Sequence, residues 1–298
     1  MLNETPTLAA DGLPYRLLTL RNSAGMVVTV MDWGATLLSA RVPMPDGSVR
    51  ETLLGCASPE QYVNQAAYLG ASVGRYANRI AKSRFTLDGT EYALLPSQGE
   101  NQLHGGPEGF DKRRWRIVQQ NDCEVLFALE SADGDQSDVR QHKLQLLADA
   151  WLPVDEMGIP YEGLKAVAGT SFDFRAPKTI AKEFLSDDYQ RKVKGYDHAF
   201  LLQAKGDVSQ PAAQVWSADE KLQMTVFTNA PALQFYSGNY LGGTPAREQG
   251  DYSDWQGLAL ESEFLPDSPN HPEFPQPDCI LRPGSEYVSL TEYQFITH

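Results

Sequence analysis

Residues 16–31 read RLLTLRNSAGMVVTVM, and this stretch gives the first indication of the fold class. Its two ends, residues 16–20 and 26–31, are rich in leucine, valine and threonine, and valine and threonine favour an extended chain. Between them, residues 21–25 (RNSAG) contain asparagine, serine and glycine, which favour a tight turn. Two such runs around a turn predict a β-hairpin.

Runs of the same kind continue along the chain. We predict strands over residues 36–42, 84–87, 91–94, 214–217, 222–227, 233–236, 258–263 and 287–295. The pair Asp88-Gly89 supplies the positive φ that a two-residue hairpin turn needs. Ser58 and Pro59 predict one brief helix that ends near Gln65. Strands without helices between them predict an all-β protein of antiparallel sheets packed face to face.

The composition is that of a globular protein, and its charge limits the possible partners. The chain has 298 residues, with 25 Lys+Arg against 39 Asp+Glu and a net charge of −14. No linker or internal repeat divides it, so we predict a single domain over residues 1–298. Its acidity argues against nucleic acid, whose binding needs a basic face. No run approaches the roughly 20 apolar residues that span a bilayer, so no membrane association is expected.

The cysteines and the amino terminus predict a cytoplasmic protein. Cys56, Cys123 and Cys279 are scattered and odd in number, which fits a reducing compartment better than a disulfide framework. Residues 1–6 (MLNETP) lack the basic lead and the apolar run of a secretory signal.

The sequence shows no cofactor motif. It lacks a Walker loop, a Gly-x-Gly-x-x-Gly after a strand and a Gly-x-Ser-x-Gly elbow. Its five histidines do not stand at metal-ligand spacing with cysteines or acidic residues. We therefore expect neither a cofactor nor a metal.

Two carboxylates fall on one face of a predicted strand. Glu261 and Glu263 lie two residues apart in an apolar run, and strand side chains alternate between faces. Such a pair can serve as general acid and base, or as the two carboxylates of a glycoside hydrolase. The pattern also fits a solvated strand face, so the residues alone leave both interpretations open.

Histidines in two loops are also ambiguous. His104 precedes two glycines, which let a ligand approach closely, but a loop histidine can equally bond to a carbonyl. Asp197 could orient the adjacent His198, or the pair could form a turn.

Three polar side chains could bind a hydroxylated ligand. Asn78 and Arg79 could donate hydrogen bonds to it, or Arg79 could be a surface charge. Gln234 stands beside Phe235 and Tyr236, which suits a sugar platform as well as an ordinary sandwich edge.

Taken together and in order, these motifs resemble the aldose 1-epimerase (galactose mutarotase) family, of the enterobacterial type. The matching segments are residues 32–36 (DWGAT), 74–80 (GRYANRI), 101–106 (NQLHGG), 195–198 (GYDH), 233–239 (LQFYSGN) and 260–263 (LESE). Each segment is weak alone, but the ordered set is specific and runs collinearly from about residue 11 to residue 295.

The resemblance implies a galactose-mutarotase-like β-sandwich that interconverts the α and β anomers of free hexoses without a cofactor. The roles it implies are Glu261 as general base, His104 on the ring-oxygen side of the sugar, and Asn78, Arg79, Asp197 and Gln234 as ligands of sugar hydroxyls. We expect a monomer or weak dimer with a free hexose as its partner.

One departure from the family pattern is large. The family carries a second histidine, its general acid, in an Asn-His-x-x-Phe-Asn-Leu motif that this chain lacks. A few dozen residues, with two or three central strands of the sandwich, are missing near residues 131–138. His271 and His142 do not replace the motif, because neither has its sequence context.

The junction suggests how the gap arose. Residues 133–136 (DGDQ) resemble both the start and the end of the missing loop, so we hypothesise an internal deletion between similar short sequences. Such a deletion exposes strand edges and removes the acid, so activity should fall strongly. The alternative is a non-catalytic or vestigial sugar-binding protein on the same scaffold.

Overall fold

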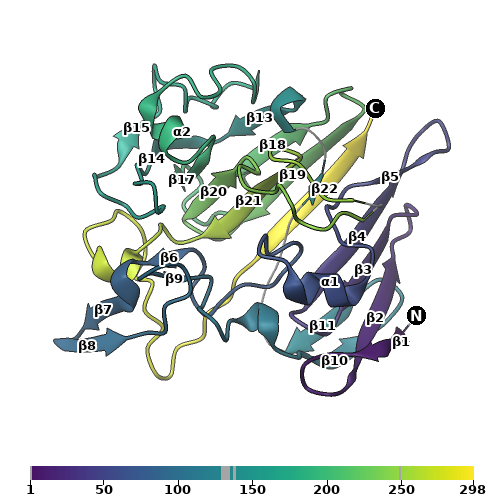
Figure 1. Cartoon of the computed structure of the whole chain (residues 1–298). Helices are drawn as coiled ribbons and strands as arrows, with labels where there is room; N and C mark the ends of the chain where they lie inside the picture. The colour runs from purple at the N-terminus through teal and green to yellow at the C-terminus, as the bar shows by residue number, and fades with distance from the viewer. Residues whose placement is uncertain (1, 129–134, 137–138, 248–249) are drawn as a thin grey trace. The chain divides into compact units, whose positions relative to one another are not determined.

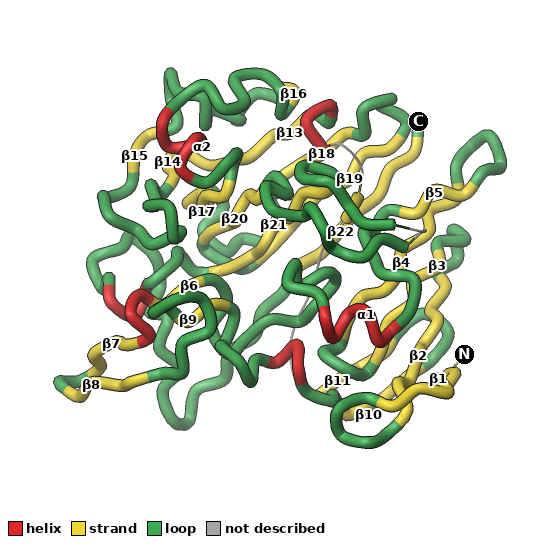
Figure 2. Tube along the Cα trace, viewed as in Figure 1, coloured by secondary structure: helices red, strands yellow, loops and turns green. Residues whose placement is uncertain are grey.

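The computed structural model describes residues 2–128, 135–136, 139–247 and 250–298 (Figure 1). Most of the regular structure is strand, with two short α-helices among the described residues (Figure 2). The chain divides into two compact units: residues 1–76, 107–137 and 240–258 form the first, and residues 77–106, 138–239 and 259–298 form the second. The proposed deletion junction falls largely outside the described residues.

The first unit contains the amino-terminal strands. Its elements are β1 (Leu2–Leu8), β2 (Pro14–Arg21), β3 (Val27–Met31), β4 (Thr36–Pro43), β5 (Val49–Glu51), α1 (Pro59–Asn64), the 3₁₀ turn η2 (Phe110–Lys112), β10 (Arg116–Gln120), β11 (Val125–Ala128), β12 (Asp135–Gln136) and the start of β21 (Gly257–Glu263). Strands β1 to β5 form one antiparallel sheet in sequence order. The hairpin predicted from residues 16–31 is confirmed, because β2 and β3 pair with Leu17 opposite Met31.

A buried apolar cluster holds the first unit together. Met31, Trp33, Leu38, Tyr62 and Leu69 pack in it. Tyr62 comes from α1, the brief helix that the sequence predicts, and Gln61 of that helix forms a capping box with Ser58. The helix therefore contributes Tyr62 to this core, while its Val63 side chain is exposed.

The second unit is larger and contains every residue predicted for the site. Its elements are β6 (Arg79–Ile80), η1 (Ala81–Ser83), β7 (Arg84–Leu87), β8 (Thr90–Ala93), β9 (Gln102–Leu103), η3 (Val139–Gln141), β13 (Lys143–Leu146), β14 (Ala148–Trp151), β15 (Lys165–Ala166), β16 (Lys178–Thr179), α2 (Asp188–Lys192), β17 (Asp197–Leu202), β18 (Ala213–Trp216), β19 (Leu222–Thr228), β20 (Ala232–Tyr236), the rest of β21, η4 (Ser268–Asn270) and β22 (Thr291–Thr297).

Two antiparallel sheets organise the second unit. One has the order β16-β13-β18-β19-β22, and the other contains β21-β20-β17-β14-β15. Both carry rows of buried side chains, such as Leu144 and Val226 in the first sheet and Phe200 and Phe235 in the second. The all-β, sandwich-type fold expected from the sequence is confirmed.

Aromatic rings fill the core of the second unit. Trp151 stacks on Phe172 with ring centroids 3.6 Å apart, and both rings meet His198 edge-on. Phe174 packs against Phe235 at 5.7 Å. These rings form a rigid support for β17 and β20, whose opposite faces carry polar site residues.

Most sequence-predicted elements are present, with some differences in extent. The β7–β8 turn has Asp88 and Gly89 at φ 50° and 78°, as the Asp-Gly pair predicts. The last strand begins at Thr291 rather than at residue 287. Helix α2 was not predicted, although the Asp187 side chain caps it by accepting from the Gln190 N–H.

Two further features concern the cysteines and the helices. All three cysteines are free. Among the described residues, no helix is long and apolar enough to cross a bilayer.

Candidate functional site

Strands β20, β21 and β17 place polar side chains on one sheet face. Gln234 of β20 pairs directly with Glu261 of β21, and with Ala199 of β17 on its other side. Because strand side chains alternate, Asp197, two residues before Ala199, and Glu263, two after Glu261, share that face. The sequence prediction that Glu261 and Glu263 lie on one face is confirmed.

Glu261 is accessible but lies in a poorly solvated setting. Its side chain is half-buried, so a ligand could still reach it. Burial raises the pKa of Glu261 to about 7, the charge of Asp197 adds to the increase, and Arg79 opposes it. A carboxyl with this pKa can accept and release a proton near neutral pH, as a general base must.

Asp197 is held by Gln234. The Nε2 of Gln234, which is buried, donates to Oδ1 of Asp197 over 2.7 Å. Burial raises the pKa of Asp197, while Arg79 and the Gln234 bond lower it. Asp197 does not orient His198: the His198 ring accepts the Asp197 backbone N–H at Nδ1 and sits among the core aromatics.

Arg79 is fixed from several sides. Its Nε donates to Oε1 of Gln98 over 2.7 Å and its Nη1 donates to Oδ1 of Asn78 over 3.2 Å. Gly158 packs against the guanidinium with a φ of 73°, and a Cβ there would come 2.6 Å from Nη1, so a larger residue would strain the backbone and displace the Arg79 side chain. Arg79 is therefore a positioned cation beside two carboxylates and not the loose surface charge that the sequence left open.

His104 lies across from Asn78, where the short β6–β9 pairing continues. The His104 N–H donates to the Asn78 carbonyl over 2.9 Å, and the Asn78 N–H donates to Nδ1 of His104 over 3.1 Å. Both residues have positive φ, at 49° for His104 and 62° for Asn78. The ring, which is half-buried, is thus held by backbone on its Nδ1 side.

Glu263 is the site residue whose function the sequence left most uncertain. It is 4% exposed, and its Oε1 accepts from Nδ2 of Asn78 over 3.1 Å. Burial and the nearby Glu261 raise the pKa of Glu263 far above its ordinary value. The only signal in the sequence is its spacing of two residues from Glu261, which places both side chains on one strand face. That spacing does not show that Glu263 is buried.

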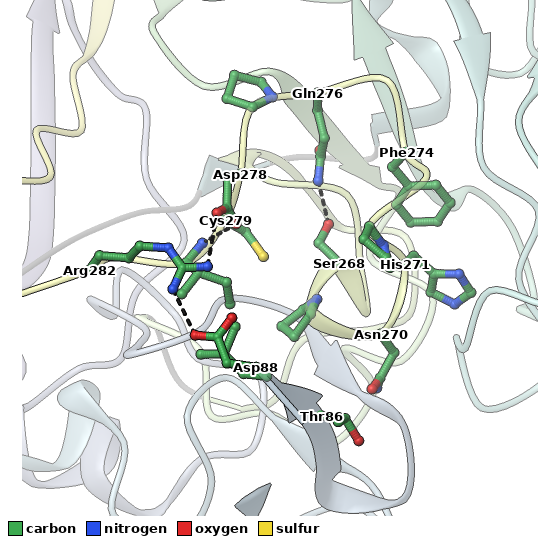
Figure 3. A pocket seen from close by; sticks show the side chains of 15 residues that line it. Thr86, Asp88, Ser268, Asn270, His271, Phe274, Gln276, Asp278, Cys279 and Arg282 are labelled. Atoms are coloured by element: carbon green, nitrogen blue, oxygen red, sulfur yellow. Dashed lines mark hydrogen bonds and ion pairs between the residues drawn. The ribbon is translucent and has the colours of Figure 1, made fainter. Parts of the chain in front are cut away.

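A cavity of about 740 Å³ lies elsewhere in the second unit (Figure 3). Its lining residues are Thr86, Leu87, Asp88, Ser268, Pro269, Asn270, His271, Pro272, Phe274, Gln276, Pro277, Asp278, Cys279, Ile280 and Arg282. Arg282 pairs with Asp88 over 2.9 Å, and His271 lies 2.8 Å from a Glu273 oxygen. The predicted site residues do not line it, so it is separate from the cluster around Glu261.

Comparisons with known proteins show the family of this chain. A family model described as aldose 1-epimerase matches residues 16–138 and 134–294. The chain belongs to the aldose 1-epimerase family. An aldose 1-epimerase of Escherichia coli is 68% identical to it, with 99% of each chain covered. A rat galactose mutarotase is 33% identical, with 90% of each covered.

Solved structures of aldose 1-epimerase relatives share the fold. A galactose 1-epimerase of Lactobacillus acidophilus superposes with a TM-score of 0.77 at 26% identity, covering 100% of this chain and 99% of that one. An aldose epimerase homologue from C. elegans gives 0.82 at 24% identity, covering 95% and 99%.

The alignments also show the predicted gap. The match to the E. coli aldose 1-epimerase extends over 344 positions, 46 more than the 298 residues of this chain. The two stretches matched by the family model overlap at residues 134–138. A few dozen family positions are therefore absent, and the family pattern resumes at the junction that the sequence predicts.

Proposed function

We propose that this chain binds free hexoses such as galactose and glucose around Glu261 and interconverts their α and β anomers at a reduced rate. The observation that carries the proposal is Glu261 itself, an accessible carboxyl with a pKa near 7 beside Asp197 and Arg79. We propose no cofactor, since opening and closing the ring requires proton transfers but no net oxidation or reduction.

The proposed reaction has two proton transfers. Glu261 takes the proton of the C1 hydroxyl, the bond between C1 and the ring oxygen breaks, and the ring oxygen takes a proton from a water molecule. The open-chain aldehyde rotates about C1–C2, and the reverse transfers close the ring on its other face. General acid and base groups typically contribute about 10²–10⁴-fold each.

Asp197 and Arg79 would bind sugar hydroxyls, since both are half-buried and carry complementary charges. Gln234 and Asn78 are 2% and 3% exposed and already engage Asp197 and Arg79. We assign these two residues to the same binding set, where they fix the geometry of the charged groups.

His104 is proposed as the imidazole on the ring-oxygen side. Its Nδ1 accepts a backbone N–H, so the neutral ring carries its proton on Nε2. A ring that keeps this bond is a neutral donor and not an imidazolium acid. His104 should therefore compensate only in part for the second histidine of the family, and the rate should stay low.

The test is polarimetry of α-galactose with the purified chain. We expect a small acceleration over the spontaneous rate that Glu261→Gln abolishes, while the exposed Glu286→Gln leaves it unchanged. A rate equal to that of an intact family member would contradict the reduced activity. A small acceleration that persists in Glu261→Gln would contradict the role of Glu261.

The second candidate is a non-catalytic sugar-binding protein, which the 46 missing positions favour. It predicts galactose binding by titration calorimetry with no acceleration of mutarotation, in the parent chain and in Glu261→Gln alike.

We also propose that the chain works in the cytoplasm as a monomer or weak dimer. The three free cysteines support a reducing compartment, and size-exclusion chromatography tests the oligomeric state.

A further inference from the structure

Glu263 lies behind the residues proposed to touch the sugar. It is 4% exposed, compared with the half-buried Glu261 two residues earlier on the same face. Its Oε2 is buried without a hydrogen-bond partner, so its identified bond is the one from Asn78 to Oε1. Burying a carboxyl oxygen without a hydrogen-bond partner lowers the stability of the fold. We therefore looked for a role of Glu263 in the site.

The bond from Asn78 to Glu263 sets the orientation of the Asn78 amide. Nδ2 donates to Glu263 and Oδ1 accepts from Nη1 of Arg79. A flipped amide would turn two N–H groups toward the guanidinium, which also donates. The two partners therefore allow one orientation, and they hold a residue whose backbone has the unfavourable φ of 62°.

The backbone of the same residue contacts His104. The Asn78 N–H donates to Nδ1 of His104, and the His104 N–H donates to the Asn78 carbonyl. Any shift of Asn78 away from its φ of 62° would move this N–H off the imidazole. The carboxyl of Glu263 is thus connected to the His104 ring through one residue.

We propose that Glu263 is a positioning residue for His104, which anchors Asn78 so that the Asn78 N–H holds the imidazole with its proton on Nε2. The effect of this positioning on catalysis rests on the proposed function, but the ring nitrogen of His104 that carries the proton can be identified without any turnover. Burial and the nearby Glu261 raise the pKa of Glu263 well above its ordinary value, which favours the neutral acid. A neutral amide of the same shape should therefore replace it.

The experiment compares Glu263→Gln with Glu263→Leu. The matched control is Leu260→Ala, a buried change on the same strand that faces away from the site. Nitrogen-15 NMR of histidine-labelled protein reports which ring nitrogen carries the proton, and the His104 signals are assigned by their loss in His104→Gln.

We expect His104 to be protonated on Nε2 alone in the parent chain, in Glu263→Gln and in Leu260→Ala. In Glu263→Leu the ring should show both tautomers. The kcat of mutarotation should fall roughly ten- to hundredfold in Glu263→Leu, with KM little changed, and should recover in Glu263→Gln. The stability of Glu263→Gln relative to the parent should rise with pH above about 4.5, because the parent must keep a buried acid protonated.

The proposal is overturned if Glu263→Leu folds and leaves the His104 tautomer unchanged, or if Leu260→Ala alters it equally. If the chain shows no mutarotation at all, the proposed function fails. The NMR comparison then still decides whether Glu263 positions His104.

Discussion

At the residue scale, the proposed chemistry depends on the surroundings of one carboxyl. Glu261 is a base only when ionised, and burial together with Asp197 raises its pKa to about 7. Mutarotation should therefore increase with pH between about 6 and 8 and then level off. Asp197→Asn should move this rise to lower pH, because it removes a charge that raises the pKa. Polarimetry across this range checks both expectations, and a rate independent of pH from 6 to 8 would contradict them.

His198 should make the fold sensitive to acid. Burial among aromatic rings lowers the pKa of His198 to about 3, and its Nε2 has no hydrogen-bond partner. In the unfolded chain the pKa is about 6.5, so the unfolded state gains a proton first as the pH falls. The stability that this group supplies is present above pH 6.5 and is lost progressively toward pH 3.

Urea unfolding at pH 7.0 and 5.5 measures this effect. The drop in unfolding free energy should be about 1 kcal/mol smaller in His198→Asn than in the parent chain. Asparagine can still accept the Asp197 N–H, and any loss of packing is common to both pH values. Equal drops in the two proteins would show that His198 is not buried as a neutral ring.

The sequence indicated which residues belong to the candidate site better than it indicated what each of them does there. The motifs pointed to Glu261, Asp197, Arg79 and His104, which the structure places in one unit. They could not show that Asn78 and Gln234 are buried beneath the charged groups, because side-chain depth depends on strand pairing across distant segments. The partnership of Glu263 with Asn78 joins residues 185 positions apart and has no local signal.

At the element scale, a buried polar network joins β17 to the end of β20. Ser237 and Asn239 bond to the backbone of Tyr196, and Asn239 also accepts from Ser237 over 2.6 Å. Gly195 packs against them, and a Cβ there would come 2.4 Å from Oδ1 of Asn239. This network gives Gly195, Ser237 and Asn239 a structural role next to Asp197, the residue of this segment that is proposed to bind the sugar.

Gly195→Ala should consequently destabilise the second unit by about 2–4 kcal/mol, since both the added methyl group and the backbone conformation oppose it. Gly163→Ala is the matched control, because a Cβ there meets no atom within 4 Å. Chemical denaturation of both variants gives the comparison. Similar losses in the two would contradict the close packing at Gly195.

Local sequence predicted the hairpins and α1 because their signals lie within a few residues. The Asp88-Gly89 turn and the Ser58 cap are such signals. Helix α2 escaped because it has five residues and no apolar periodicity, although Asp187 was an available cap signal. Strand β22 starts late because its pairing with β19 begins where Thr291 lies opposite Thr228. This long-range contact cannot be read from residues 287–295 alone.

At the scale of the whole molecule, the chain is a member of the aldose 1-epimerase family that lacks one segment. The aldose 1-epimerase of Escherichia coli aligns with 99% of this chain, yet the alignment has 46 more positions than the chain has residues. Resemblance to the family located the gap, and among the described residues Glu261, Gln234 and Asp197 share one face of a sheet. The expectation of one domain stays a prediction, and the chain divides into two compact units.

The most direct measurement restores the missing segment. The corresponding residues of the E. coli aldose 1-epimerase would be inserted at residues 131–138, and α-galactose mutarotation would be followed by polarimetry. We expect the rate of mutarotation to increase about 10²–10⁴-fold over the parent chain. Glu261→Gln in the insertion variant should abolish this increase. A folded insertion variant that is no faster than the parent chain would contradict it, since the retained cluster would then not be a mutarotase site that lacks only its acid.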